Sequence, residues 1–133
     1  TAAAHPEHDS STENITSRNF DLVYETHPTN DGKAWLLWGN GATMSGNQWS
    51  GSAWGSATVL TGSDDTSFIA LHSNPATGAV FAADYQSTAS APDDLSERHL
   101  LGGSASWSSA ATIWAGSVVA EPVMFRVGFD TER

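Results

Sequence analysis

The chain has 133 residues and a formal net charge of −10, from 15 acidic and 5 basic side chains, and it contains no cysteine. This length suits one domain, because domains most often run to about 100–150 residues. The lack of cysteine excludes disulfides, thiolate metal ligands and thiol catalysis within the chain. Because the pI is near 4.5 and no basic stripe occurs, we expect no charge-driven binding of nucleic acid or anionic membranes. No run of about 18 apolar residues occurs, so no transmembrane helix is expected.

Composition also bears on location. Lysine occurs once, acidic residues dominate, and Ser, Thr and Gly are abundant. Extracellular and surface proteins of prokaryotes often have this composition, so we expect an extracellular or cell-surface protein; an acidic cytosolic protein is the alternative. The chain begins at Thr1, as it would after removal of a leader or within a longer polypeptide. Asn14 lies in an N-glycosylation acceptor pattern, for which a chance match is the alternative.

Residues 1–19 are polar and hold one large apolar side chain, Ile15. Such a segment buries too little apolar surface to offset the entropy lost on ordering. We therefore expect a loose arm or linker at 1–19, followed by a β-repeat domain at 20–133.

Strand signals begin at residues 19–25, which are rich in β-branched and aromatic side chains. Asp31-Gly32 then indicates a hairpin turn, and residues 33–38 predict the return strand. The same pattern of strand, turn and strand recurs at residues 67–72 and 79–85, which are joined by another turn. These segments predict two β-hairpins of related design.

A second sequence pattern also repeats along the chain. Segment 52–60 resembles segment 105–113, since each has a tryptophan, a run of small residues and a β-branched strand. We predict an all-β fold of antiparallel sheets, built from about two 50-residue propeller-blade-like repeats. These units span residues 20–67 and 68–121, and a partial third spans 122–133. Chance similarity among Ser- and Gly-rich strands is the alternative.

One segment has some helical character. The segment is residues 92–101 (PDDLSERHLL), for which Asp93 or Ser90 is a candidate N-cap and Gly102-Gly103 a stop. We expect at most one or two helical turns there.

The order of strand, Asp-Gly turn, aromatic strand and the segment 49–54 (WSGSAW) resembles repeats of bacterial extracellular β-propeller-like proteins, of the sialidase and lectin blade type. The resemblance spans residues 20–129. Residues 29–35 approximate the sialidase Asp box, Ser/Thr-x-Asp-x-Gly-x-x-Trp, but lack one residue between Asp31 and Gly32, so the motif is not met. The resemblance implies blade-like sheets, and a propeller typically needs four or more blades.

Two repeats and a fragment cannot close a propeller. The chain is then a piece of a longer propeller, part of a ring or filament of several copies, or a sandwich that closes by itself. We therefore expect a non-enzymatic extracellular structural or adhesive module that associates with itself or another chain, as in a filament, pilus or surface layer. A carbohydrate-binding propeller-type lectin module is the first alternative, and a fragment of a glycoside hydrolase is the second.

Six tryptophans in 133 residues are the main candidates for a binding role. We expect Trp49, Trp54 and Trp107 in Ser- and Gly-rich loops, where an indole can stack on a sugar ring or anchor a subunit interface. Anchoring the core of each repeat is the alternative for all three.

Metal ligation is weakly indicated. His5 and His8 lie among carboxylates in the polar arm, which is a ligand set suited to zinc, copper or nickel. Calcium is possible at two acidic pairs, Asp64-Asp65 and Asp93-Asp94, which we expect in loops, but neither has the Asp-x-Asp-x-Asp-Gly spacing. Solvated side chains are the alternative in each case, and we predict no cofactor, no metal and no catalytic residues.

Overall fold

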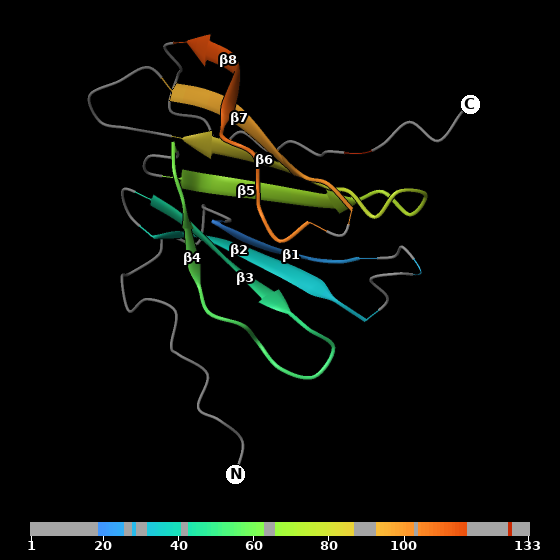
Figure 1. The fold of residues 1–133 in the computed structure, drawn as a ribbon. Coiled ribbons are helices and arrows are strands. Elements are labelled where there is room, and N and C mark those ends of the chain that lie inside the picture. The colour runs from blue at the N-terminus through green and yellow to red at the C-terminus, as the bar shows by residue number, and fades with distance from the viewer. Residues whose placement is uncertain are drawn as a thin grey trace.

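The computed structural model describes residues 19–25, 28, 32–40, 43–62, 66–86, 93–102, 104–116 and 128. These residues form eight β-strands in two four-stranded antiparallel sheets and contain no α-helix (Figure 1). The first sheet consists of β1 (Phe20–Tyr24), β2 (Ala34–Asn40), β3 (Thr43–Trp49) and β4 (Thr58–Leu60). The second consists of β5 (Thr66–Ser73), β6 (Val80–Gln86), β7 (Asp93–Leu100) and β8 (Ala111–Gly116). The prediction of an all-β, antiparallel fold is confirmed.

Each sheet is a meander in which neighbouring strands along the chain pair with each other. The two predicted hairpins, β1–β2 and β5–β6, are both present. In the β5–β6 turn, Asn74 accepts a hydrogen bond from the Ala76 N–H through its side chain, at 2.9 Å. Gly32 and Gly78 have φ values of 83° and 70°, which glycine adopts readily before a return strand.

The two sheets meet face to face and come closest where β1 and β2 of the first sheet approach β5 of the second. Asp21 Oδ2 accepts a hydrogen bond from the Leu71 N–H at 2.8 Å, which ties β1 to the edge of β5. A Cβ atom on Gly39 would lie 2.7 Å from the Thr66 carbonyl oxygen, so glycine is required for this approach. Within the described residues, β4 and β8 form no comparable contact across the sheets.

The core lies between the sheets and is built from alternate side chains that strands β2 to β7 turn inward. It contains Trp35, Leu37, Met44 and Leu60 from the first sheet and Ile69, Val80, Ala82 and Leu100 from the second. Trp107, from the β7–β8 loop, packs against residues of both sheets and closes one end of this core.

Two strands differ from the sequence-based expectation. The predicted helical turns at 92–101 are wrong, because the segment forms β7, which pairs with β6 on one side and β8 on the other. Ser96, Arg98 and Leu100 alternate with outward residues and are all buried, which favours a strand over a helix. β3 was not predicted, because its Ser, Gly, Asn and Gln residues have low β-propensity.

The boundary between the sheets falls between Leu60 and Thr66, close to the predicted boundary between the repeats at residues 67 and 68. The predicted polar arm lies outside the described residues, except for Asn19, and so does the partial third repeat, except for Gly128. The propeller-blade character of the repeats stays a prediction.

Candidate functional site

The outer face of the first sheet carries an exposed apolar surface. Alternate residues of β1, Phe20, Leu22 and Tyr24, point away from the second sheet and are 58%, 43% and 59% exposed. Phe20 lies opposite Trp38 and Leu22 opposite Leu36 in the β1–β2 register, so these five side chains share one face. We refer to them as the apolar outer face.

The corresponding face of the second sheet is different at β5 and β6. Phe68, Ala70 and Tyr85 point away from the first sheet and are buried together, with Phe68 and Tyr85 only 9% and 7% exposed. The two sheets therefore leave unequal outer faces, and the open apolar one belongs to the first sheet.

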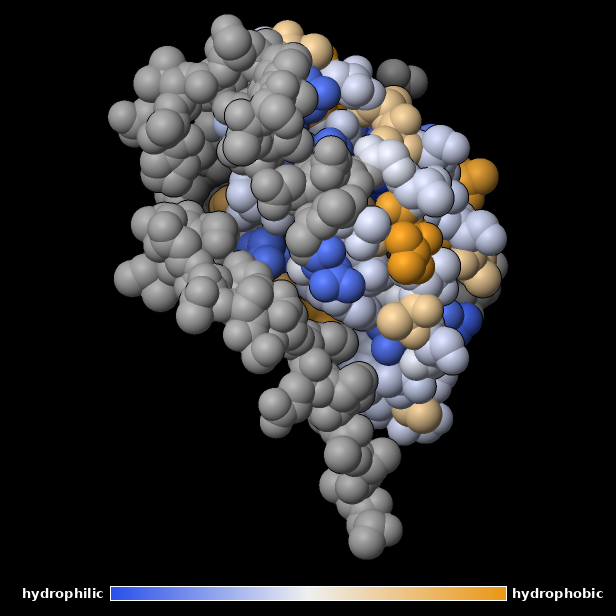
Figure 2. Space-filling view, turned by 90° about the vertical axis from the view of Figure 1, so that its left-hand side faces the viewer, coloured by the Kyte–Doolittle hydropathy of each residue, from blue (hydrophilic) through white to orange (hydrophobic). Residues whose placement is uncertain are grey.

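One sheet edge is also exposed and apolar. The side chains from Ala111 to Ala115 in β8 are all solvent-exposed, and they include Ile113 at 53% and Trp114 at 46%. An edge strand of uncharged, β-prone residues can pair with a strand of another chain. Figure 2 shows one side of the molecule, where the described residues are mostly weakly hydrophilic and hydrophobic residues are scattered.

A cavity of about 210 Å³ lies between the sheets at the side of β4. Its walls come from β4 and the residue after it, from the β7–β8 loop, and from Trp35, Gly46 and Arg98. Because the sheets approach most closely at β1, β2 and β5, the space between them opens toward β4 and the segment before β8. The cavity therefore results from the divergence of the two sheets toward β4.

Two indoles form one wall of the cavity. The rings of Trp35 and Trp107 meet edge to face, with centroids 5.5 Å apart and planes at 84°. Glu25, which is 3% exposed, accepts hydrogen bonds from Trp35 Nε1 at 3.0 Å and from Gln48 Nε2 at 3.2 Å. The indole N–H of Trp107 is buried, and no acceptor bonds it within the described part of the chain.

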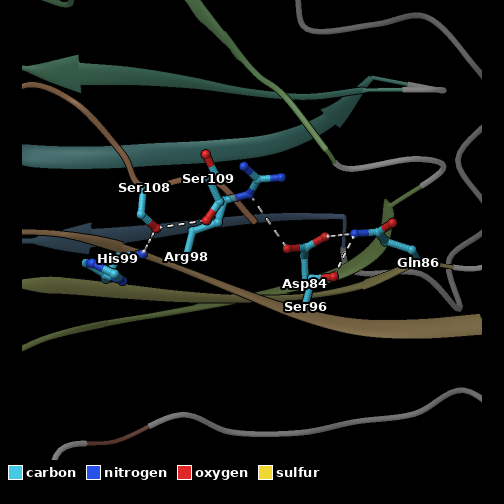
Figure 3. A network of polar contacts seen from close by, with 7 residues as sticks. All are labelled: Asp84, Gln86, Ser96, Arg98, His99, Ser108 and Ser109. Atoms are coloured by element: carbon cyan, nitrogen blue, oxygen red, sulfur yellow. Dashed lines mark hydrogen bonds and ion pairs between the residues drawn. The ribbon is translucent and has the colours of Figure 1, made fainter. Parts of the chain in front are cut away.

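A buried ion pair lies beside the cavity. Arg98 and Asp84 are 1% and 0% exposed, and Arg98 Nε lies 4.0 Å from Asp84 Oδ1. Gln86 Nε2 donates to Asp84 Oδ2 at 2.8 Å and to Ser96 Oγ at 3.2 Å (Figure 3). Burial lowers the pKa of the Arg98 guanidinium, and the carboxylate of Asp84 opposes this shift.

The β7–β8 loop is held in place by serine side chains. Ser108 Oγ accepts a hydrogen bond from the His99 N–H and donates one to the Ser109 carbonyl, both at 3.0 Å (Figure 3). Ser104 Oγ accepts from the Ser106 N–H at 3.0 Å and donates to the Ser106 carbonyl at 3.2 Å. These bonds fix the loop that carries Trp107 over the cavity.

The structure separates the three tryptophans that the sequence singled out. Trp49, expected in a loop, is the last residue of β3, and Trp54 bridges to it. Their rings lie 5.6 Å apart at 59°, so each packs on the other while remaining partly exposed. Trp107 does lie in a loop, but it packs against the core and lines the cavity.

Most metal candidates lie outside the described residues, namely His5, His8, Asp64 and Asp65, as does the glycosylation candidate Asn14. The expectation of a loop at Asp93-Asp94 is wrong, because both residues belong to β7. Among the residues that the structure describes, no group of three or more His, Asp or Glu side chains is placed to hold a metal ion.

Sequence reasoning missed Arg98, Asp84 and the apolar outer face. The apolar outer face had a signal in the sequence, because the pattern Phe-Asp-Leu-Val-Tyr at residues 20–24 places apolar residues on both faces of that strand. Alternation in Ser-Glu-Arg-His-Leu at 96–100 would have placed Arg98 on the same face as a buried leucine.

The comparisons with known proteins found no match. No family model matches the chain, and no curated protein or solved structure matches it either. In the described part of the chain, no helix is long and apolar enough to cross a membrane.

Proposed function

We propose that this chain is a non-enzymatic, extracellular structural or adhesive module that assembles with copies of itself through the apolar outer face. The observation that carries the proposal is the exposure of Phe20, Leu22 and Tyr24 side by side with Leu36 and Trp38. Covering such a surface is favourable by roughly 25 cal/mol per Å² of apolar area removed from water. Its extracellular placement rests on composition: a single lysine and many Ser, Thr and Gly residues.

The internal packing supports contact between sheet faces. The inner face of the first sheet is already covered by the face of another four-stranded sheet. The outer face of a second copy offers the same side chains, and an identical patch on both partners gives a two-fold symmetric contact. The outer face at β5 and β6 is a poorer partner, because Phe68 and Tyr85 are buried.

The arrangement of the sheets supports a blade-like reading of the repeats. Propellers place four-stranded sheets radially around a channel, so the same edge of every sheet lies near the axis. Here the first strands of the two sheets, β1 and β5, lie together, while β4 and β8 form no comparable contact. Two such sheets cannot close a ring, which motivates assembly of several copies. The exposed edge of β8 offers a second contact for growth into a filament or surface layer.

Sedimentation equilibrium of two charged variants tests this proposal. We expect the unmodified chain to associate as its concentration rises and Leu22→Lys to remain monomeric, because a lysine in the contact must be desolvated without a partner. Ile113→Lys, on the exposed edge of β8, is the matched control and should keep the first association step. Both positions are exposed, so circular dichroism should show unchanged folds.

Three results would count against the proposed contact. If Leu22→Lys associates as strongly as the unmodified chain, the apolar outer face is not the contact. If Ile113→Lys alone abolishes association, copies assemble by edge pairing at β8 instead. The third result is a chain that is monomeric alone but forms a stoichiometric complex with another protein in native material. The apolar outer face would then bind a partner chain and not a second copy.

A further inference from the structure

We propose that residues 122–129 of this chain dock on the outer face of the second sheet at β5 and β6. This face carries Phe68, Ala70, Ala83 and Tyr85, and we refer to these four side chains as the β5–β6 outer face. The contact is separate from the apolar outer face of the first sheet and does not depend on self-assembly. It accounts for the unequal exposure of the two outer faces.

The β5–β6 outer face is buried although it points away from the first sheet. Phe68 pairs with Tyr85 and Ala70 with Ala83, whereas the alternate residue Ile69 points into the core between the sheets. All four side chains are no more than 9% exposed. An antiparallel sheet that packs on one side commonly leaves its other face in water. Burial on this side therefore requires a further layer over β5 and β6.

The described strands do not account for this layer. Phe20 and Phe68 both lie on the outer face of the first strand of a four-stranded sheet, but they are 58% and 9% exposed. The position in the sheet alone therefore does not bury a phenylalanine. Within the described part of the chain, the buried cluster of Phe68, Ala70 and Tyr85 contains residues of β5 and β6 only.

One segment outside the described residues has a sequence suited to this layer. Apart from Ile15, the large apolar residues outside the described part of the chain all lie between positions 118 and 129. In residues 122–129 (PVMFRVGF), apolar side chains recur at every second position, which is typical of a strand with one apolar face. That face would consist of Val123, Phe125, Val127 and Phe129, which alternate with Met124, Arg126 and Gly128.

Gly128, the one described residue of this segment, is consistent with the alternation. It is exposed, and a Cβ atom added to it would meet nothing within 4 Å. Gly128 thus belongs to the side of the segment that faces open space. The apolar positions on the opposite side are then left to face the sheet.

The connection from β8 is long enough for this contact. β8 ends at Gly116 and is the edge strand of the same sheet. The five residues 117–121 can span up to roughly 17 Å, at about 3.3–3.6 Å per residue. Strands lie about 4.8 Å apart, so the middle of the β5–β6 pair is roughly 12 Å from β8. The segment reaches this face without passing around the first sheet.

Disulfide trapping in the full chain tests the proposal. The chain contains no cysteine, so two introduced cysteines can pair only with each other or with another copy. We would combine Ala83→Cys in turn with Val123→Cys, Phe125→Cys and Val127→Cys, and oxidise each variant mildly. At least one combination should form a disulfide within the chain, because docking brings two Cβ atoms to the roughly 3.5–4.5 Å that a disulfide needs.

Matched controls separate docking from chance encounter. Met124→Cys and Arg126→Cys, on the other side of the alternating pattern, should pair with Ala83→Cys at least about tenfold more slowly, because their Cβ atoms point away from it. Leu36→Cys, on the outer face of the first sheet, should not pair with the segment. If Ala83→Cys fails to fold by circular dichroism, Ala70→Cys on the same face replaces it.

A charged substitution gives a second measurement. Phe125→Lys should lift the segment from the sheet and uncover Phe68 and Tyr85, so fluorescence of the dye ANS, which binds exposed apolar surface, should rise at least about twofold. Met124→Lys is the matched control and should leave the dye signal unchanged. Both measurements are made with Leu22→Lys also present, so their results do not depend on assembly through the apolar outer face.

Several outcomes would overturn the proposal. If disulfides form only between copies, a second chain covers the β5–β6 outer face. If no combination pairs within the chain, or if Met124→Cys and Arg126→Cys pair as fast as their apolar neighbours, the segment does not dock through its apolar side. An unchanged dye signal in Phe125→Lys would show that another part of the chain buries Phe68 and Tyr85.

Discussion

At the scale of single residues, the most demanding feature is the ion pair of Arg98 and Asp84 between the sheets. Both side chains are almost completely buried. Taking two charges out of water costs several kcal/mol for each, and their mutual attraction and hydrogen bonds must offset that cost. Gln86 bonds the carboxylate of Asp84 and helps to do so. The pair therefore depends on both partners being present.

Removing one partner should destabilise the fold strongly. We expect Asp84→Asn to lower the free energy of unfolding by about 3–5 kcal/mol, because the Arg98 guanidinium is then buried without its counter-charge. The double variant Asp84→Leu with Arg98→Met should lie much closer to the unmodified chain. Urea unfolding followed by tryptophan fluorescence measures both. A single variant as stable as the unmodified chain would show that the guanidinium reaches water.

Gly39 gives a second prediction at this scale. An alanine Cβ there would lie 2.7 Å from the Thr66 carbonyl oxygen, so Gly39→Ala must push β2 and β5 apart. Forced repacking of this kind typically costs about 1–3 kcal/mol. Gly55→Ala is the control, because its Cβ would meet neighbours at an ordinary 3.5 Å. Thermal unfolding should show a lower midpoint for Gly39→Ala only, and equal midpoints would contradict the close approach of the sheets.

At the scale of elements, the local residue pattern predicted the two hairpins. It did not predict β3 and β7, whose conformation depends on pairing with neighbouring strands. Residues 19–25 and 33–38 were identified because β-prone side chains flank an Asp-Gly turn, which is local information. β3 has few β-prone residues, and a Cβ at Gly46 would lie 2.5 Å from Leu37 Cδ2, so a larger residue there would displace the Leu37 side chain. β7 resembles a short helix in isolation, and its pairing with β6 and β8 overrides that tendency.

Two adjacent leucines test the strand character of β7. Leu100 is completely buried in the inner face, whereas Leu101, the next residue, is 66% exposed. Leu100→Ala should lower the free energy of unfolding by about 2–5 kcal/mol, and Leu101→Ala should change it by less than about 0.5 kcal/mol. Chemical unfolding of the two variants side by side measures this difference. Similar losses in both would be inconsistent with the alternation of a strand.

At the scale of the whole molecule, the two meanders explain both the open apolar face and the cavity. The sheets meet along β1, β2 and β5, which covers the inner face of the first sheet and leaves its outer face open, and the space between the sheets widens toward β4. Strand patterns and repeats predicted antiparallel sheets, whereas the need for a partner chain stays a prediction. The cavity and its ion pair could not be predicted, because they depend on how one sheet sits on the other.

The most direct test of the account is the mass of the unmodified chain in solution. Light scattering over a range of concentrations should show a rise from the 14.0 kDa of one chain to at least twice that value. The rise should disappear in Leu22→Lys, while Ile113→Lys retains it. A mass of 14.0 kDa at every concentration, with the apolar outer face still accessible to water, would contradict self-assembly through that face.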